Sequence, residues 1–371
     1  MNSAFALAPI VWFTLGGPLF GQLKIGEVDP LTGGVSQFGV SCHHGIELAL
    51  GQVNAAGGVN GQNLELISED NQSRPGQSAT AVHKLITQDH VQAILGDATS
   101  SATLESAPIA QQAKVPMVTP SGTNPRITEV GNEIFRVCFL DEFQGRVMAH
   151  FAHDKLKLAK IAVLTDVRQD YSVDLARFFK DEFIKLGGNI VREQSYSTGD
   201  TDFRAQVTAL RAVKPDAIYI PGYYAEVALA LKQARQFGLN VPVLGCDGWA
   251  NQALLSVAGK AVENTYFTNH FSPDDPAPIV RAFVDAYQSK FGQPPDTFAA
   301  LGYDAALIVV DAFRRAGSER PEGLRDALAA TTRYAGVTGE ITFDARRNAS
   351  KPALVITVKD GKFEVAGKVT P

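Results

Sequence analysis

The stretch that decides the fold is Gly96–Pro125, with the sequence GDATSSATLESAPIAQQAKVPMVTPSGTNP. Two short apolar runs, Ala93–Gly96 and Pro116–Thr119, are typical of buried strands, and each is followed by small hydroxyl residues. The helical run Ala102–Ala113 lies between them. A strand–helix–strand order predicts parallel strands, and in parallel α/β sheets ligands bind beyond the carboxyl ends of the strands.

The hydroxyl residues after these two strands form the first candidate site. Thr99, Ser100 and Ser101 follow the first strand, and Ser121 and Thr123 follow the second. The first group opens a helix, whose free N–H groups and positive dipole end suit a carboxylate. Ordinary helix capping is the alternative for either group alone. Two groups on successive strands favour a small carboxylate ligand at the sheet edge.

Strands and helices alternate outward from this stretch in two series. The first series adds Leu23–Val28, Gly39–Ala56, Leu64–Ser68 and Ala79–Gln88. The second comprises Ile161–Thr165, Ser172–Leu186, Ile190–Gln194, Phe203–Ala212, Ala217–Ile220, Glu226–Phe237 and Val243–Gly245. Repeated βαβ units predict a parallel sheet with helices on both faces. The sequence therefore predicts an α/β protein with two doubly wound parallel-sheet lobes.

Three hinge strands are expected to join the lobes, near Arg136–Phe143, Phe267–Ser272 and Glu340–Ala345. The apolar helix Ala299–Arg315 suits the core of the first lobe, and Asp360-Gly361 predicts a hairpin turn near the end of the chain. The expected ranges are 22–140 plus 271–343 for lobe one, and 141–270 plus 344–371 for lobe two.

Composition and motifs exclude several classes of function. The chain has 371 residues, a net charge of −5 and no cluster of Lys or Arg, which argues against nucleic-acid binding. It has no Gly-x-Gly-x-x-Gly after a strand and no Walker sequence. We find no convincing Ser-His-Asp or Cys-His arrangement, so we expect neither an enzyme nor a cofactor.

The cysteine and histidine residues do not predict a metal site. Cys42, Cys138 and Cys246 lack metal-ligand spacing, and buried free thiols are expected. His43 and His44 lie next to Cys42, but adjacent residues point to different faces of a helix. A surface or core role for these histidines is therefore favoured over metal binding.

The N-terminal segment resembles a secretory leader in part. The first 23 residues carry no charged side chain, and the apolar run Ala4–Leu15 is too short to span a bilayer. It resembles the apolar core of a signal peptide without the preceding basic residues. We expect residues 1–21 to be a truncated or misassigned leader, with a disordered tail as the alternative.

A set of short motifs occurs in order from Leu23 to the end of the chain. They are Ile25-Gly26, Leu31-Thr32-Gly33, Phe38-Gly39, Asn54–Gly61, Ser100-Ser101, Thr119-Pro120-Ser121, Phe135-Arg136, Gln144-Gly145, Asp170-Tyr171, Pro221-Gly222-Tyr223 and Gly245–Gly248. Each motif alone is weak, but the ordered set is specific. It resembles the periplasmic leucine/isoleucine/valine-binding proteins of ABC importers, which have the type I periplasmic binding protein fold.

This resemblance implies contacts to a bound amino acid. Ser100 corresponds to a serine that meets the α-carboxylate, and Ser121 supplies a backbone carbonyl toward the α-ammonium group. Thr123 corresponds to a threonine that contacts both charged groups. Tyr171 and Tyr223 resemble tyrosines that close over the ligand from the second lobe.

Further positions are implied for the ammonium group and the side chain of the ligand. Asp247 falls where the family often has the glutamate that faces the ammonium, and a plain turn role is the alternative. The positions that line the side-chain pocket are Phe38, Ala98, Thr99 and Phe298. Ala98 stands where a larger apolar residue is common. The lobe-one disulfide of the family is absent, since its places correspond to Gln72 and Thr99.

The residues agree chemically with an amino-acid ligand, which needs donors for one end and acceptors for the other because buried charges require partners. We therefore expect a monomeric, periplasmic or otherwise extracytoplasmic binding protein. It would capture an L-amino acid, branched-chain or otherwise apolar, and present it to a membrane permease of an ABC importer. The alternative is a ligand-sensing domain of the same fold that binds an amino acid or an amide.

Overall fold

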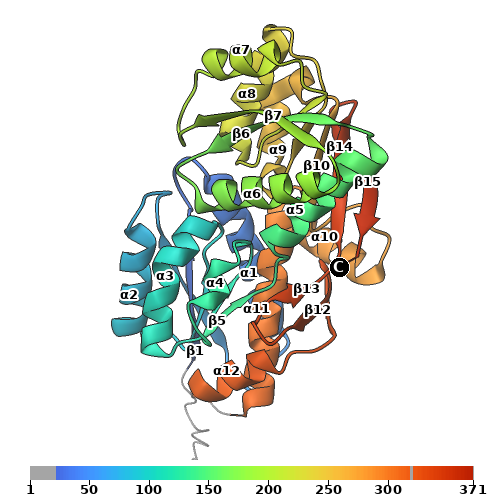
Figure 1. Cartoon of the computed structure of the whole chain (residues 1–371). Helices are drawn as coiled ribbons and strands as arrows, with labels where there is room; N and C mark the ends of the chain where they lie inside the picture. Colours follow the sequence, from blue (N-terminus) through green and yellow to red (C-terminus); the bar gives the residue numbers. More distant parts are fainter. Residues whose placement is uncertain (1–21, 318–320, 371) are drawn as a thin grey trace, which may run out of the picture.

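The chain forms two lobes, each built around its own β-sheet (Figure 1). The structure is a computed structural model that describes residues 22–317 and 321–370. The expected leader or disordered tail, residues 1–21, lies outside the described residues.

The first lobe contains a five-stranded sheet in which all neighbouring strands are parallel, in the order β2-β1-β3-β4-β5. Its strands are β1 (Leu23–Asp29), β2 (Leu64–Asp70), β3 (Ala93–Gly96), β4 (Met117–Thr119) and β5 (Ile134–Arg136). The helices around it are α1 (Ser36–Ala55), α2 (Gln77–Thr87), α3 (Ser100–Ala113), α4 (Arg126–Glu129), α10 (Pro278–Phe291), α11 (Thr297–Ala316) and α12 (Pro321–Ala329). The strand order reverses at β1, which leaves a crevice at the carboxyl ends of β1 and β3.

The second lobe contains a seven-stranded sheet in the order β15-β14-β10-β9-β8-β6-β7. Its strands are β6 (Lys160–Asp166), β7 (Asn189–Tyr196), β8 (Ala217–Tyr219), β9 (Val243–Gly245), β10 (Thr265–Asn269), β14 (Ala353–Lys359) and β15 (Lys362–Val369). The helices are α5 (Asp141–His150), α6 (Asp170–Lys185), α7 (Arg204–Ala212), α8 (Tyr224–Gln236) and α9 (Gln252–Ala258), with a π-helical turn at Phe151–Lys155 and 3-10 turns at Asp247–Trp249 and Gly259–Val262.

Strands β6 to β10 pair in parallel, whereas β14 and β15 pair antiparallel at one edge. The predicted α/β fold with two doubly wound lobes is therefore confirmed.

Antiparallel strands complete the chain. A small sheet contains β11 (Tyr334–Gly336), β12 (Gly339–Phe343) and β13 (Ala349–Ser350). The hairpin of β14 and β15 turns at Asp360 and Gly361, whose φ angles of 50° and 71° are those of a type I′ turn. The predicted hairpin turn is confirmed.

The chain passes between the lobes after β5, after β10 and after β13. The first crossing differs from the expected hinge strand at Arg136–Phe143, because β5 ends at Arg136 and α5 already begins at Asp141. Asp141 and Glu142 occupy the first turn of α5, where negative charge stabilises a helix. The residues between, 137–140, are neither helix nor strand.

The third crossing also differs from expectation. Strand β12 overlaps the expected hinge at Glu340–Ala345, but it pairs with β11 and β13 rather than leading directly into the second sheet. The chain joins that sheet only at Ala353. Strand pairing thus moves the expected boundary between 343 and 344 to Lys351-Pro352. The buried Lys351 donates from Nζ to the carbonyl of Val137 at 3.3 Å, which links the first and third crossings.

The core of the first lobe depends on the contact between α1 and α11. Leu301, Ala305 and Ile308 of α11 are buried in one cluster with residues of β1 and β3, as expected for this apolar helix. The two helices lie so close that a Cβ atom at Gly45 would be 2.0 Å from the Ala299 carbonyl oxygen. The absence of a side chain at Gly45 therefore allows α11 to lie this close to α1.

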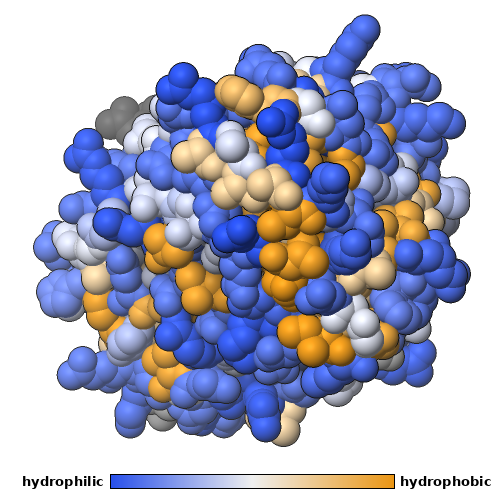
Figure 2. Space-filling model, turned by 45° about the horizontal axis from the view of Figure 1, so that its top comes forward, coloured by the Kyte–Doolittle hydropathy of each residue, from blue (hydrophilic) through white to orange (hydrophobic). Residues whose placement is uncertain are grey.

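The surface is mainly hydrophilic on the face in Figure 2, where hydrophobic residues form separate groups between polar ones. Exposed large hydrophobic side chains include Val167, Val173 and Ile184. Within the described residues, no helix is both long enough and apolar enough to cross a membrane.

Candidate ligand-binding site

The loops after β3 and β4 form the first wall of the candidate site. Thr99 has extended backbone and precedes α3, so the first N–H groups of this helix, beginning with Ser100, have no acceptor within it. Ser121 Oγ donates to the Ala98 carbonyl at 2.8 Å, and the Asn124 N–H donates to Ser100 Oγ at 3.2 Å. These two bonds hold the loops side by side.

Thr123 follows in the same loop and is fully buried. Its Oγ1 atom makes no hydrogen bond of normal geometry, although the hydroxyl lies close enough to the Asp141 carboxyl to lower the pKa of that group. A buried hydroxyl without a partner is costly, because it has lost the bonds that it would form with water. A buried hydroxyl of this kind is expected where a polar group of a ligand binds and supplies the missing hydrogen bond.

The second wall comes from the other lobe, through Tyr171, Tyr223 and Asp247. Tyr171 lies at the start of α6 and Tyr223 directly before α8, and their rings stack with centroids 5.2 Å apart. The Tyr171 hydroxyl donates to Asp247 Oδ1 at 2.5 Å, whereas the Tyr223 hydroxyl is buried without a partner. Asp247 opens the 3-10 turn after β9.

An aromatic cluster bridges the two walls. Phe38 of α1 stacks on Phe298 of α11 at 4.1 Å between centroids and meets the edge of Tyr223 at 5.5 Å. Ala98 is buried in the same cluster. Phe38, Ala98 and Phe298 thus lie in one buried cluster with Tyr223, and Thr99, the fourth expected pocket residue, lines a cleft together with Tyr223.

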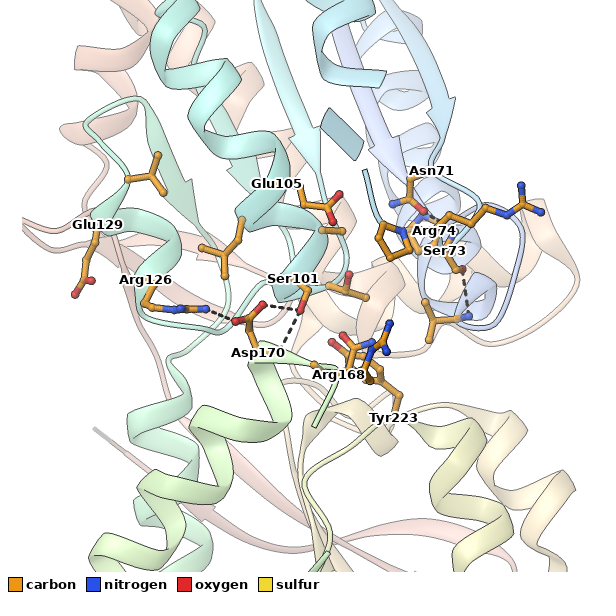
Figure 3. Close-up of a pocket in the computed structure, with 18 residues that line it drawn as sticks. Asn71, Ser73, Arg74, Ser101, Glu105, Arg126, Glu129, Arg168, Asp170 and Tyr223 are labelled. Atoms are coloured by element: carbon orange, nitrogen blue, oxygen red, sulfur yellow. Dashed lines mark hydrogen bonds and ion pairs between the residues drawn. The ribbon is translucent and has the colours of Figure 1, made fainter. Parts of the chain in front are cut away.

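This cleft, about 700 Å³ in volume, opens outward between the lobes (Figure 3). Arg126 forms an ion pair with Asp170, and Ser101 Oγ contacts the Asp170 carboxylate at 3.1 Å, so one residue of the second lobe holds two of the first. Asn124 Nδ2 also donates to Asp174 Oδ2 at 2.9 Å. The lobes are therefore in contact along this edge of the cleft.

A buried polar network surrounds Asp247. Gln144 Nε2 donates to Asp247 Oδ1 at 2.9 Å and to Asp141 Oδ1 at 2.8 Å. His270 Nε2 lies 3.0 Å from Asp247 Oδ2, and the imidazole stacks on Phe139 at 3.6 Å between centroids. Asp141 Oδ2 and His270 Nδ1 have no partner.

Burial shifts the protonation of this network. It lowers the pKa of His270 to about 4, although the bond to Asp247 acts in the opposite direction. It raises the pKa of the Asp141 carboxyl to about 8, and the nearby charge of Asp247 adds to the rise. Two acidic side chains therefore share one buried region, and one of them favours its neutral form at neutral pH.

Sequence reasoning did not identify Asp141 or His270 as candidates, and it noted Gln144 only within a motif. All three follow the carboxyl ends of strands, Asp141 and Gln144 after β5 and His270 directly after β10. The reasoning that found Ser100 and Ser121 after β3 and β4 would have found Asp141 and Gln144, had the end of β5 been placed correctly.

The remaining candidates have structural partners. Cys42, Cys138 and Cys246 are buried free thiols, as expected. His43 contacts Glu27 at 2.7 Å, and His44 stacks on Phe291. Among the residues that the structure describes, no three His, Cys, Asp or Glu side chains are arranged to hold a metal.

Comparison with known proteins gives a consistent result. The family model described as periplasmic binding protein matches residues 22–362. A leucine-, isoleucine-, valine-, threonine- and alanine-binding protein of Pseudomonas aeruginosa is 32% identical over 349 residues, which cover 93% of this chain and 92% of that protein. A Leu/Ile/Val-binding protein homolog of Brucella suis is 30% identical, with 97% of each chain covered.

Solved structures agree over nearly the whole chain. The leucine-binding protein LivK of Thermotoga maritima is 40% identical with a TM-score of 0.91, covering 94% of this chain and 99% of that chain. The branched-chain amino acid transporter substrate-binding protein LivJ of Streptococcus pneumoniae, in complex with isoleucine, is 35% identical with a TM-score of 0.90, covering 95% and 100%. On its sequence and its fold, this chain belongs to the periplasmic binding protein family, among the leucine/isoleucine/valine-binding proteins.

Proposed function

We propose that this protein captures an apolar L-α-amino acid between its lobes and delivers it to the membrane permease of an ABC importer. The observation that carries the proposal is a pair of buried hydroxyl groups, one from each lobe. Tyr223 OH has no partner, and Thr123 Oγ1 has only the buried Asp141 carboxyl beside it. They lie in one connected set of contacts with the open end of α3 and the carboxylate of Asp247. A zwitterion supplies the donors and acceptors that such a set lacks.

The first lobe would bind the α-carboxylate. The N–H groups at the start of α3 and the hydroxyls of Ser100 and Thr123 are suitable donors, and the helix dipole favours negative charge there. The Ser121 carbonyl and the acidic side chains around Asp247 would face the α-ammonium group. Tyr171 and Tyr223 would cover the ligand from the second lobe.

The aromatic cluster favours an aliphatic side chain. Phe38 and Phe298 are almost fully buried and carry no polar group, and Ala98 and Thr99 add little volume to the wall. Relatives named for leucine, isoleucine, valine, threonine and alanine support the same class of ligand. We place the protein outside the cytoplasm, as a monomer without catalytic activity, as is usual for binding proteins of this family.

Calorimetric titration tests the proposed function. Leucine, isoleucine, valine, alanine and phenylalanine would each be titrated into the full chain, with a sugar and a nucleotide as negative controls. We expect binding of at least one branched-chain amino acid and none of the controls. Tight binding of the sugar or the nucleotide, with no binding of any amino acid, would refute the proposal.

A further inference from the structure

A second groove lies on the second lobe, between α5 with its π-helical turn and the hairpin of β14 and β15 (Figure 1). Its volume is about 660 Å³, which is within the range of about 300–1,000 Å³ that is usual for small-molecule sites. The groove and the cleft between the lobes have no lining residue in common. A ligand of the groove would therefore not occupy the proposed amino-acid site.

The first wall of the groove is one face of α5 and of the π-helical turn that follows it. Phe143, Val147 and Phe151 line the groove at intervals of four residues, so they form one apolar row along the helix. Phe143 packs on Phe139 at 6.0 Å between ring centroids, and Phe151 packs on Tyr266 at 5.3 Å. Both rings are held in place and still only half-buried. Helical turns of the π type occur frequently at functional sites.

The opposite wall comes from β14 and β15 and contains a glycine within a strand. Val355 of β14 is buried and pairs in register with Gly367 of β15. Apart from the neighbours of Gly367 in the chain, no heavy atom of the described residues would lie within 4 Å of a Cβ atom added there. Val369 lines the groove two residues further on and is 37% exposed. A strand glycine often marks a place where a ligand or another backbone approaches closely.

Two cationic residues of the helical wall line the groove beside its apolar row. Lys155 continues the row that runs through Val147 and Phe151, and Arg146 directly precedes Val147. Both side chains are exposed. Within the described part of the chain, neither side chain has an ion pair or a hydrogen bond. The wall thus combines an apolar surface with positive charge that is not neutralised locally.

The acidic residue that lines the groove, Asp154, is already engaged. His150 Nδ1 lies 2.9 Å from Asp154 Oδ2, and His153 Nδ1 lies 2.7 Å from Asp154 Oδ1. These contacts lower the pKa of the Asp154 carboxyl, so it stays ionised and paired with the two imidazoles. A ligand ammonium group would have to compete with both histidines for this acceptor. The groove therefore suits an anion better than a zwitterion or a cation.

We propose that this groove is a second binding site, for a small amphipathic anion with an apolar body and one carboxylate or sulfonate group. The apolar body lies against Phe143 and Phe151 and fills the space above Gly367. The anionic group is directed toward Arg146 and Lys155. Exposed ion pairs contribute little, so burial of the apolar body supplies most of the affinity and the two cations supply the preference for an anion.

The test is a fluorescence titration of the full chain with anilinonaphthalene sulfonate, an amphipathic anion whose emission rises in apolar surroundings. Octanoate and octanamide then compete with this probe, because they share one apolar chain and differ in charge. We expect saturable binding of the probe and displacement by octanoate. Octanamide should compete about fivefold more weakly, and leucine should not displace the probe.

Three variants locate the bound probe. Gly367→Val fills the groove without changing its charge and should lower the affinity for the probe about tenfold or more. Its free energy of unfolding should not fall, because the added side chain enters open space and valine is favoured in strands. Lys155→Gln and Arg146→Gln should each lower the affinity about two- to fivefold. Lys157→Gln is the matched control, since this exposed cation does not line the groove, and it should bind the probe like the wild type.

Four results would overturn the inference. A folded Gly367→Val protein that binds the probe like the wild type would place the probe elsewhere on the surface. Displacement by leucine would place it in the cleft between the lobes. Equal competition by octanoate and octanamide would show that the cations have no role. Absence of saturable binding to the wild type would leave the groove to a macromolecular partner. If Gly367→Val does not fold, the two charge variants and the two competitors still decide.

Discussion

At the scale of single residues, Asp247 shows how a buried charge is accommodated in this site. It accepts from Tyr171 of α6, Gln144 of α5 and His270, which directly follows β10. Removing one member of such a set leaves the others buried without partners, which typically costs more than the net value of the bonds themselves. The network should therefore respond strongly to truncation and weakly to an isosteric change.

Asp247→Ala should weaken binding of the amino acid by about 3–5 kcal/mol, or two to three decades in Kd. Asp247→Asn should lose less, because it keeps an acceptor for Tyr171. Calorimetric Kd values for both variants check this, with Asp181→Ala, an exposed position on α6, as the control. An effect of tenfold or less for Asp247→Ala would mean that this residue serves only the local turn.

His270 should make the stability of the protein depend on pH. Its pKa is lowered to about 4 by burial, below the value of about 6.5 in the unfolded chain. The unfolded state therefore binds more protons between these values, and stability falls as pH drops through this window. The full difference amounts to about 3 kcal/mol.

Urea unfolding of the wild type and His270→Gln at pH 7, 5.5 and 4.5 measures this effect. We expect the wild type to lose stability relative to the variant as pH falls. The same comparison for His83→Gln, an exposed histidine on α2, should show no such trend. Identical pH dependence of the wild type and His270→Gln would contradict the assignment of this effect to His270.

At the scale of elements, the sequence was sufficient wherever apolar runs were bounded by clear turn residues. Ala93–Gly96 and Val243–Gly245 were predicted with the bounds that the structure has. The expected hinge strand Arg136–Phe143 is interrupted in the structure, because β5 ends at Arg136 and α5 begins at Asp141. Asp141 was consequently placed in a hinge strand and overlooked as a site residue.

Contacts between residues that lie far apart in the sequence could not be predicted from the local pattern of apolar and polar residues. The link between Lys351 and Val137 joins crossings that lie far apart in the sequence. The partners of Asp247 likewise come from α5, α6 and the end of β10. Single-sequence patterns report which face of an element is apolar, but not which distant polar groups will meet.

The contact between α1 and α11 provides a prediction for packing. A Cβ atom at Gly45 would lie 2.0 Å from the Ala299 carbonyl oxygen, so Gly45→Ala must push the helices apart. We expect a loss of about 1–3 kcal/mol in the free energy of unfolding. Gly51→Ala on the same helix meets only the Lys290 ammonium, at 3.9 Å, and should gain up to about 1 kcal/mol from helix propensity.

Chemical denaturation of both glycine variants decides this prediction. If Gly45→Ala lowers the free energy of unfolding and Gly51→Ala raises it, the loss is due to the helix contact rather than to the alanine itself. Equal effects would contradict the view that close approach of α1 and α11 fixes the first lobe.

At the scale of the whole molecule, contacts between protein groups alone hold the lobes together only weakly at the cleft edge. The side chains of Arg126 and Asp170 are 52% and 43% exposed, and ion pairs of this kind contribute about 0–1 kcal/mol. A ligand held by residues of both lobes would add contacts that exist only when the lobes meet. Such a ligand must therefore shift the equilibrium toward closure.

Closure can be measured by placing spin labels at Arg74→Cys and Arg168→Cys, which lie on opposite sides of the cleft at exposed positions (Figure 3). The native cysteines are buried and should not react. Addition of leucine should shorten and narrow the distance distribution, and the radius of gyration from small-angle scattering should fall. A pair within one lobe, Arg74→Cys with His83→Cys, should not change. If the pair across the cleft gives the same distance with and without bound leucine, the three crossings do not act as a hinge, and ligand capture must proceed without movement of the lobes.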